Sequence, residues 1–143
     1  MEICDLGPED PRWAAAFPVL VQLRAHLGRE AFAEIYRSGF AQGLRYTAAF
    51  DAATGRCLGV AGWRQMATTS SVRKVYVDDL VTDEGERSRG VGAALLHHLA
   101  KVARDAGCRA LELDSGVQRH DAHRFYLREG FVISSHHFSK PLE

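Results

Sequence analysis

The amino-acid sequence predicts one α/β domain over residues 1–143, with a mixed sheet of six or seven strands and helices on both faces. Its 143 residues are 46% hydrophobic and 25% charged, the balance of a globular domain that buries its own core. Short β-branched runs between turn residues fill the first half, which is typical of an antiparallel meander. A strand, a helix and a strand then follow one another, which predicts a right-handed crossover.

The first half is expected to hold four strands and two helices. Gly28 separates two helical patterns, and Phe32, Tyr36 and Phe40 recur at helical spacing in the second one. Short runs of turn residues, one of which contains Gly55, separate the later strands. We predict strands over residues 2–6, 45–50, 57–66 and 72–82, and helices over residues 12–27 and 29–40.

The second half is expected to hold two helices and two strands. Val91, Leu95 and Leu99 form one apolar stripe, which is typical of an amphipathic helix. Gly107 follows at the position where glycine commonly ends a helix. We predict helices over residues 90–106 and 121–129, and strands over residues 109–113 and 131–138.

The charge balance argues against a polyanionic partner. Lys and Arg number 18 and so do Asp and Glu, so no overall field favours nucleic acid or an anionic membrane. No run approaches the roughly 18 apolar residues that a membrane-spanning helix needs. We therefore expect neither nucleic acid nor a membrane as a partner.

The three cysteines, Cys4, Cys57 and Cys108, are far apart and form no CxxC pair. This spacing favours reduced thiols over a disulfide framework or a zinc site. Residues 1–10 contain acids and a proline, where a signal peptide would have a basic and then an apolar stretch. We expect a cytoplasmic protein.

The most informative stretch is a glycine-rich loop between a predicted strand and a predicted helix. The free amides and the positive dipole end of that helix would point at the loop, and two glycines let a ligand approach the backbone closely. A diphosphate suits this environment. The loop consists of Arg87, Ser88, Arg89, Gly90, Val91, Gly92 and Ala93.

Two common diphosphate motifs do not match this loop. A Walker loop needs GxxxxGK[ST], which is absent, and a dinucleotide-binding fingerprint needs a third glycine where the chain has Leu95. The pattern R-x-x-G-x-G after a mid-chain strand instead resembles the acetyl-CoA loop of the GNAT family of N-acetyltransferases.

A second motif strengthens this resemblance. Residues 120–131, HDAHRFYLREGF, look like the A-x-x-F-Y-x-x-x-G-F end of a GNAT domain. Residues 119–130 are also similar to the aminoalkylphosphonate N-acetyltransferases, which we interpret as kinship and not as a substrate assignment. The resemblance covers residues 45–140 well and the first 40 weakly.

The resemblance implies an enzyme that moves an acetyl group from acetyl-CoA, its co-substrate, to a primary amine of a small molecule by direct attack in a ternary complex. It implies a splay between the parallel strands 74–82 and 109–114, where the cofactor lies. Backbone groups of Leu80, Val81 and Thr82 would bond the pantetheine arm, and the loop amides would hold the pyrophosphate. Arg119 stands where the family often has asparagine, and its guanidinium would reach a phosphate. A homodimer is common in the family.

The reaction needs a base, because a lysine-like amine has a pKa of about 10.4 and is mostly protonated at neutral pH. On a regular strand Tyr76, Asp78 and Leu80 would share one face, and Val77, Asp79 and Val81 the other. We favour Asp78 as base or substrate anchor and place Asp79 second, because Asp79 suits a bulge or a structural ion pair as well. The family pattern makes Tyr126 the acid that protonates the leaving thiolate.

Several alternatives stay open at this point. A protein acetyltransferase is the nearest enzymatic alternative. A non-catalytic acyl-CoA-binding module is the second, and a nucleotide-binding regulator, which would bind ATP or NAD in place of coenzyme A, is the third. His120 and His123 are three residues apart, but no HExxH or cysteine-rich set accompanies them. A solvated helix start fits these histidines better, so we predict no metal site.

Overall fold

The computed structural model describes all 143 residues, which form two compact units, residues 1–112 and residues 113–143. The first unit holds the sheet and three α-helices, and the second holds one short helix and a terminal segment.

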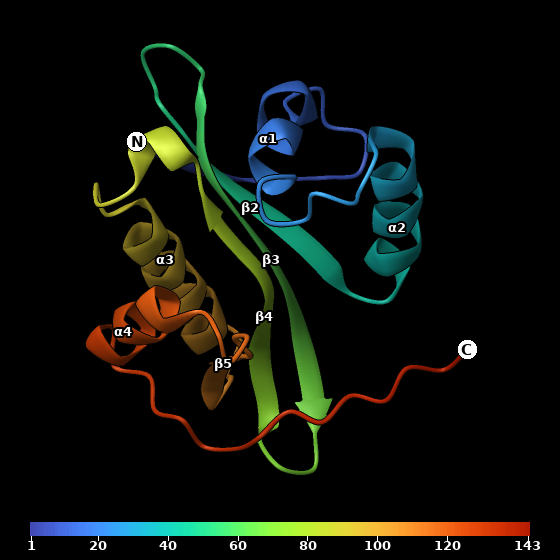
Figure 1. The fold of residues 1–143 in the computed structure, drawn as a ribbon, viewed down its shortest axis with the longest axis vertical. Coiled ribbons are helices and arrows are strands. Elements are labelled where there is room, and N and C mark those ends of the chain that lie inside the picture. The colour runs from blue at the N-terminus through green and yellow to red at the C-terminus, as the bar shows by residue number, and fades with distance from the viewer. The chain divides into compact units, whose positions relative to one another are not determined.

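One sheet organises the first unit (Figure 1). Its strands lie in the order of the sequence, and the first four pair antiparallel, as the meander predicted. A mixed sheet results when the fifth strand joins the edge of β4. The strands are β1 (Glu2–Leu6), β2 (Leu44–Phe50), β3 (Cys57–Thr68), β4 (Val72–Thr82) and β5 (Ala110–Leu113).

Helices cover both faces of this sheet, as predicted (Figure 1). Val81 of β4 packs in the core formed with the first two helices, whereas its neighbour Leu80 packs against the third helix. Because successive side chains of a strand point to opposite faces, these two cores lie on opposite sides. The helices of this unit are α1 (Trp13–Leu20), α2 (Arg29–Ala41) and α3 (Val91–Asp105), with a 3₁₀ turn, η1 (Glu84–Glu86), before α3.

An aromatic cluster fixes α1 and α2 on β2. The ring of Trp13 lies 4.7 Å from that of Phe32, and the rings of Tyr36 and Tyr46 lie 5.0 Å apart. The Tyr36 hydroxyl donates to the carbonyl of Leu6 at 2.5 Å. Buried aromatic pairs with satisfied polar groups give a well-specified core, so both helices are held firmly beside the sheet.

The first predicted helix, over residues 12–27, is shorter in the structure. It ends at Leu20, and turns follow up to the start of α2. Gln22 and Arg24 leave the helical path and bond to residues 83–84 and 78–79 of the chain. These long-range bonds outweigh the helical pattern of the sequence, because propensity is only a weak prior.

The predicted strand over residues 131–138 is absent, so the sheet has five strands instead of six or seven. In the second unit only α4 (His120–Arg128) is regular. Val132, Ile133 and Phe138 expose between 75% and 91% of their surface. An apolar pattern alone does not make a strand, since its backbone groups need a hydrogen-bonded neighbour.

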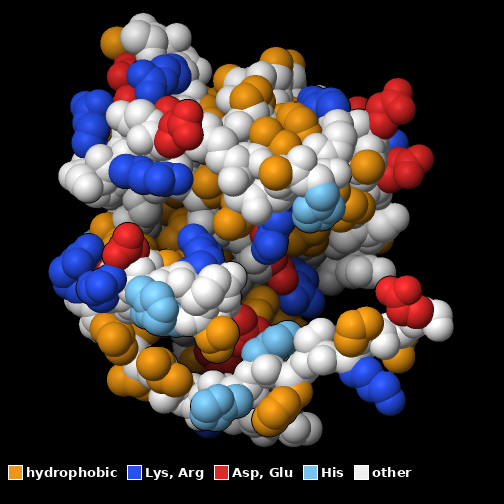
Figure 2. Space-filling view, viewed as in Figure 1, with side chains coloured by type: hydrophobic (Ala, Val, Ile, Leu, Met, Phe, Trp, Pro, Cys, Tyr) orange, Lys and Arg blue, Asp and Glu red, His pale blue; other side chains and the backbone are white.

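The distribution of charge on the surface agrees with the equal numbers of acidic and basic residues in the sequence. Figure 2 shows acidic and basic side chains interspersed on the visible face. None of the helices combines the length and the apolarity that crossing a bilayer would require.

Candidate active site

The glycine-rich loop leads directly into α3. Gly90 is the N-cap residue and has φ +79°, a left-handed conformation that favours glycine. The first backbone bond of the helix runs from the N–H of Ala94 to the carbonyl of Gly90. The amides of Val91, Gly92 and Ala93 therefore have no acceptor within the helix, and no acidic residue occupies its first turn.

Gly90 itself faces open space. A Cβ built on Gly90 would meet no atom within 4 Å. Ser88 also has a positive φ, +69°, so the chain bends sharply twice before the helix. Free amides, a positive dipole end and room for a ligand are the features that would suit an anion.

The two arginines of the loop differ in their surroundings. Both are exposed, but Arg89 forms an ion pair with the buried carboxylate of Glu86. Glu86 also binds Arg56 at 2.7 Å. The charge of Arg89 is thus partly balanced, whereas Arg87 makes no ion pair and keeps a full positive charge beside the loop.

Strand β4 has one paired edge and one partly open edge. Leu80, Val81 and Thr82 pair with β3. On the other side the N–H of Arg109 donates to the carbonyl of Arg73, so β5 starts beside the beginning of β4 and is only four residues long. The last residues of β4 extend past this short partner, which leaves backbone groups for an extended ligand arm.

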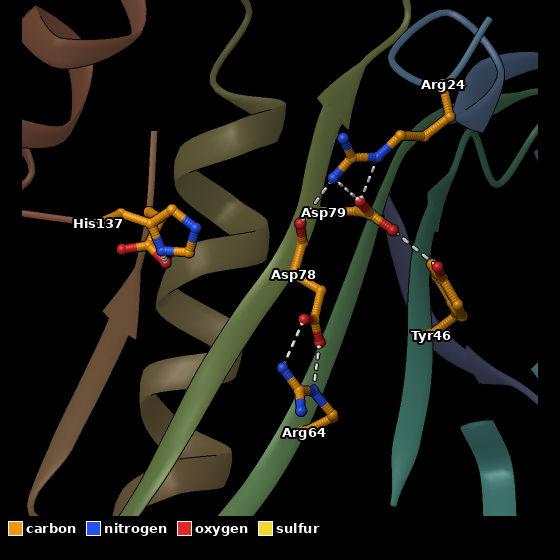
Figure 3. A network of polar contacts seen from close by, with 7 residues as sticks. Arg24, Tyr46, Arg64, Asp78, Asp79 and His137 are labelled. Carbon is orange, nitrogen blue, oxygen red and sulfur yellow. Dashed lines mark hydrogen bonds and ion pairs between the residues drawn. The ribbon is translucent and has the colours of Figure 1, made fainter. Parts of the chain in front are cut away.

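A β-bulge interrupts β4 where the two neighbouring aspartates lie. Asp79 pairs with Gly62 and Val77 pairs with Trp63, so Asp78 is the extra residue between them. The predicted strict alternation of side chains over residues 76–81 is therefore wrong. Because the bulge shifts the alternation, Asp78 and Asp79 both bond side chains of the α1–α2 side (Figure 3).

Asp79 is the buried member of this pair. It accepts hydrogen bonds from Arg24 Nε at 2.8 Å and from the Tyr46 hydroxyl at 2.7 Å. Burial, followed by the charge of Asp79, raises the pKa of Tyr46 well above its usual range. Asp79 is thus held in a structural network that links α1–α2 to the sheet.

Asp78 is more exposed and binds Arg64 in a bidentate pair. Arg64 Nε and Nη2 each donate to one carboxylate oxygen at 2.8 Å. The hydrogen bond with Asp78 raises the pKa of Arg64 above its ordinary value. Each carboxylate oxygen still has a free lone pair, so Asp78 can accept a further proton donor.

Asp78 lies on the wall of a cavity of about 570 Å³ in the first unit. One face of α2 forms one side of this cavity, and strands β2, β3 and β4 form the other. A cavity of this size accommodates a small organic molecule. Its lining residues are Glu34, Ile35, Ser38, Gly39, Gln42, Leu44, Tyr46, Arg64 and Asp78.

Two further predicted site residues, Tyr126 and Arg119, lie in the second unit. Tyr126 is buried in α4, and its ring lies 5.3 Å from that of Phe125 and 5.8 Å from that of Phe131. Burial raises the pKa of Tyr126 above its ordinary value, while the charge of Arg119 lowers it. The hydroxyl therefore carries its proton at neutral pH.

The histidines of the second unit have other partners. The rings of His120 and His123 lie 5.9 Å apart, and His123 Nε2 is 2.7 Å from the carbonyl of Gly116. His137 lies 3.3 Å from Asp114 (Figure 3). No group of three or more His, Cys, Asp or Glu side chains lies together in a way that would hold a metal ion.

Sequence reasoning missed Arg24, Tyr46, Arg64 and Glu34 at this site. Gly62 was the available clue, because an interior glycine in a strand often marks a bulge or a close approach. A Cβ at Gly62 would lie 2.6 Å from the ring of Tyr46. The glycine therefore lets the tyrosine lie flat against β3 and reach Asp79.

Comparison with known proteins decides the family. The model of the acetyltransferase (GNAT) family matches residues 15–131. The chain belongs to the GNAT acetyltransferase family. As a GNAT protein it is an acyltransferase, in agreement with both the glycine-rich loop and the motif at residues 120–131.

The relatives of this GNAT protein agree with the assignment. It is 33% identical over 132 residues to the uncharacterized N-acetyltransferase YhdJ of Bacillus subtilis, covering 91% of this chain and 92% of that one. It is 41% identical over 66 residues to the aminoalkylphosphonate N-acetyltransferase of Salmonella typhimurium, covering 46% and 43% of the two chains.

Solved structures confirm the predicted GNAT fold. An acetyltransferase from Agrobacterium tumefaciens is similar with a TM-score of 0.82 at 22% identity, covering 99% of this chain and 100% of that one. One from Trypanosoma brucei has a TM-score of 0.80 at 23% identity and covers 99% of both chains.

Proposed function

We propose that this enzyme transfers the acetyl group of acetyl-CoA to the primary amine of a small molecule, by direct attack within a ternary complex. The observation that carries the proposal is the position of Asp78, whose carboxylate lines a cavity of about 570 Å³. A carboxylate facing a cavity of this size suits a small ammonium compound.

Acetyl-CoA would bind along β4 and at the start of α3. The free amides of the loop residues 87–93 and the charge of Arg87 suit the pyrophosphate. The backbone of Leu80 to Thr82 suits the pantetheine arm, which would add to the open edge like a short strand. Arg119 would contribute a phosphate contact from the second unit.

Asp78 would receive the proton of the attacking amine, directly or through a water molecule. Its bidentate pair with Arg64 fixes the carboxylate without using all of its lone pairs. Asp79 is the second candidate, but Arg24 and Tyr46 already engage it. A strand N–H near Val81 would donate to the oxyanion that forms on the thioester carbonyl.

Tyr126 would protonate the leaving thiolate. Its raised pKa keeps the hydroxyl loaded with a proton at neutral pH. The sulfur of coenzyme A then leaves as a thiol, while the acetyl group forms an amide with the acceptor nitrogen.

Release of free thiol from acetyl-CoA, measured with a panel of small amines, tests this proposal. Aminoalkylphosphonates belong in the panel because of the Salmonella relative. Tyr126→Phe should lower kcat by about 10² or more with little change in the KM for acetyl-CoA. Tyr36→Phe, which removes another buried hydroxyl, serves as the control and should keep kcat.

Two alternatives predict different results. Binding of acetyl-CoA without turnover of any amine would favour a non-catalytic acyl-CoA module. Turnover of peptide amines alone would favour a protein acetyltransferase.

The proposal extends to the whole chain. The family match crosses the boundary between the two units, which supports a single domain over residues 1–143. All three cysteines are free, which suits the reducing cytoplasm. We also propose that the protein forms a homodimer.

A further inference from the structure

The cavity beside Asp78 is lined by more negative than positive groups. Three ionisable groups of fixed sign line it: Glu34, Arg64 and Asp78. Arg64 and Asp78 neutralise each other through two hydrogen bonds of 2.8 Å. Glu34 makes no hydrogen bond or ion pair, so it leaves the cavity with one uncompensated negative charge.

The helix presents Glu34 together with other polar groups. Glu34 and Ser38 lie four residues apart on one face of α2, and Gln42 follows at the same spacing as the C-cap residue of the helix. Ile35 and Leu44 add apolar surface to the same cavity. This lining suits a short hydrocarbon chain that ends in a hydrogen-bond-donating cation.

The two carboxylates belong to different walls of the cavity. Asp78 comes from the bulge of β4, and Glu34 comes from the second turn of α2. An acceptor whose reacting nitrogen lies at Asp78 therefore meets Glu34 with another part of its structure. An anionic end would meet this unpaired carboxylate instead of a free cation, because the guanidinium of Arg64 is already engaged.

We infer that the acceptor is a small diamine, whose second ammonium group binds Glu34 while the first is acetylated. This inference rests on the proposed function and names its substrate class. It separates the acceptor of this chain from the aminoalkylphosphonates of the Salmonella relative, which carry an anionic group at that end.

Kinetics with matched acceptors test the inference. Thiol release is measured with diamines of three to five carbons, with the corresponding monoamines, and with 2-aminoethylphosphonate. We expect kcat/KM for the best diamine to exceed that of its monoamine by about fivefold or more, the effect of one exposed ion pair. Because the pair is exposed, added salt should reduce this preference.

Glu34→Gln removes the charge to which we attribute the preference for diamines over monoamines. It should lower kcat/KM for the diamine and bring the diamine-to-monoamine ratio close to one. Glu30→Gln removes the same charge from the same helix, away from the cavity lining, and should keep the ratio. Circular dichroism of both variants checks that they fold alike.

The outcomes distinguish a failure of the diamine inference from a failure of the proposed function. Turnover of monoamines without a diamine preference, a preference that survives Glu34→Gln, or faster turnover of the phosphonate would overturn the diamine inference alone. Absence of thiol release with every amine would overturn the proposed function and the inference with it.

Discussion

At the scale of the residue, the conformation of Gly90 is the feature on which the proposed binding of acetyl-CoA depends. Its left-handed φ turns the chain into α3, and the space above it is open. A carboxylate placed there would meet the diphosphate of the cofactor with like charge, while the helix dipole would favour the intruding anion. The proposed pyrophosphate site therefore requires this space to stay free of a side chain.

We predict that Gly90→Asp abolishes the rise in melting temperature that acetyl-CoA gives to the wild type. Gly107→Asp is the matched control, because Gly107 has φ +76° and equally open surroundings just past the other end of α3. Both variants should lose similar stability, but only the control should respond to acetyl-CoA in a thermal-shift measurement. A normal response of the Gly90 variant would refute the placement of the pyrophosphate.

Cys57 gives a second prediction at this scale. Burial raises the pKa of its thiol to about 11. Since only the thiolate reacts with alkylating reagents, labelling of Cys57 by iodoacetamide should be slow at pH 8 and should keep rising up to pH 11. The half-buried Cys108 serves as the internal comparison in a mass-spectrometric assay. A rate for Cys57 that levels off near pH 9 would contradict the prediction.

At the scale of the element, the turns between α1 and α2 connect the two parts of the site in the first unit. Gln22 bonds Asp83 and the N–H of Glu84, just before the glycine-rich loop. Arg24 bonds Asp79 and the carbonyl of Asp78 at the bulge. One short segment thus holds both the approach to the cofactor loop and the candidate base in place.

A double-mutant cycle measures this connection. Arg24→Met leaves a buried Asp79 carboxylate without its cation and should cost about 2 kcal/mol of unfolding free energy. Asp79→Asn in the same background should then cost less than it does alone, with a coupling of about 1 kcal/mol in urea titrations. Lys101→Met, which breaks an exposed pair with Asp105, should cost about 0.5 kcal/mol or less. Strictly additive effects would show that the Arg24–Asp79 contact is unimportant.

The elements also show what the sequence can and cannot predict. The bounds of β4 and the start of α3 follow from β-branched residues and from Gly90, because these effects are local. The end of α1 and the bulge at Asp78 depend on contacts with Asp83, Tyr46 and Arg64, which lie far away along the chain. Motif positions were therefore predictable, whereas the partners of the aspartates were not.

At the scale of the whole molecule, the terminal segment of residues 131–143 contrasts with the sheet. It has no ladder bonds, and its large apolar side chains are exposed. The sequence pattern of a strand is nevertheless present there. A second copy that supplies the missing backbone partner would explain both observations.

We expect hydrogen exchange of the backbone amides to show whether a second copy pairs with this segment. At low concentration the amides of residues 132–138 should exchange within seconds, while those of β3 and β4 stay protected. At high concentration the segment should gain protection together with a doubling of the mass in light scattering, and Ile133→Lys should prevent both changes. Exchange that stays independent of concentration would exclude a dimer built on this segment.

The extra residue at the bulge also determines where the length of β4 can change during evolution. Val75 and Val77 are buried before it, and Asp79 and Val81 are buried after it, but Val77 pairs with Trp63 while Asp79 reaches Tyr46 on the opposite side. Because Asp78 and Asp79 lie on the same side, deleting Asp78 would leave Val77 and Asp79 in ordinary alternation, and the later side chains would keep their faces. A residue inserted or deleted elsewhere in β4 would instead turn the later side chains over, so position 78 is where the fold tolerates a change in strand length best.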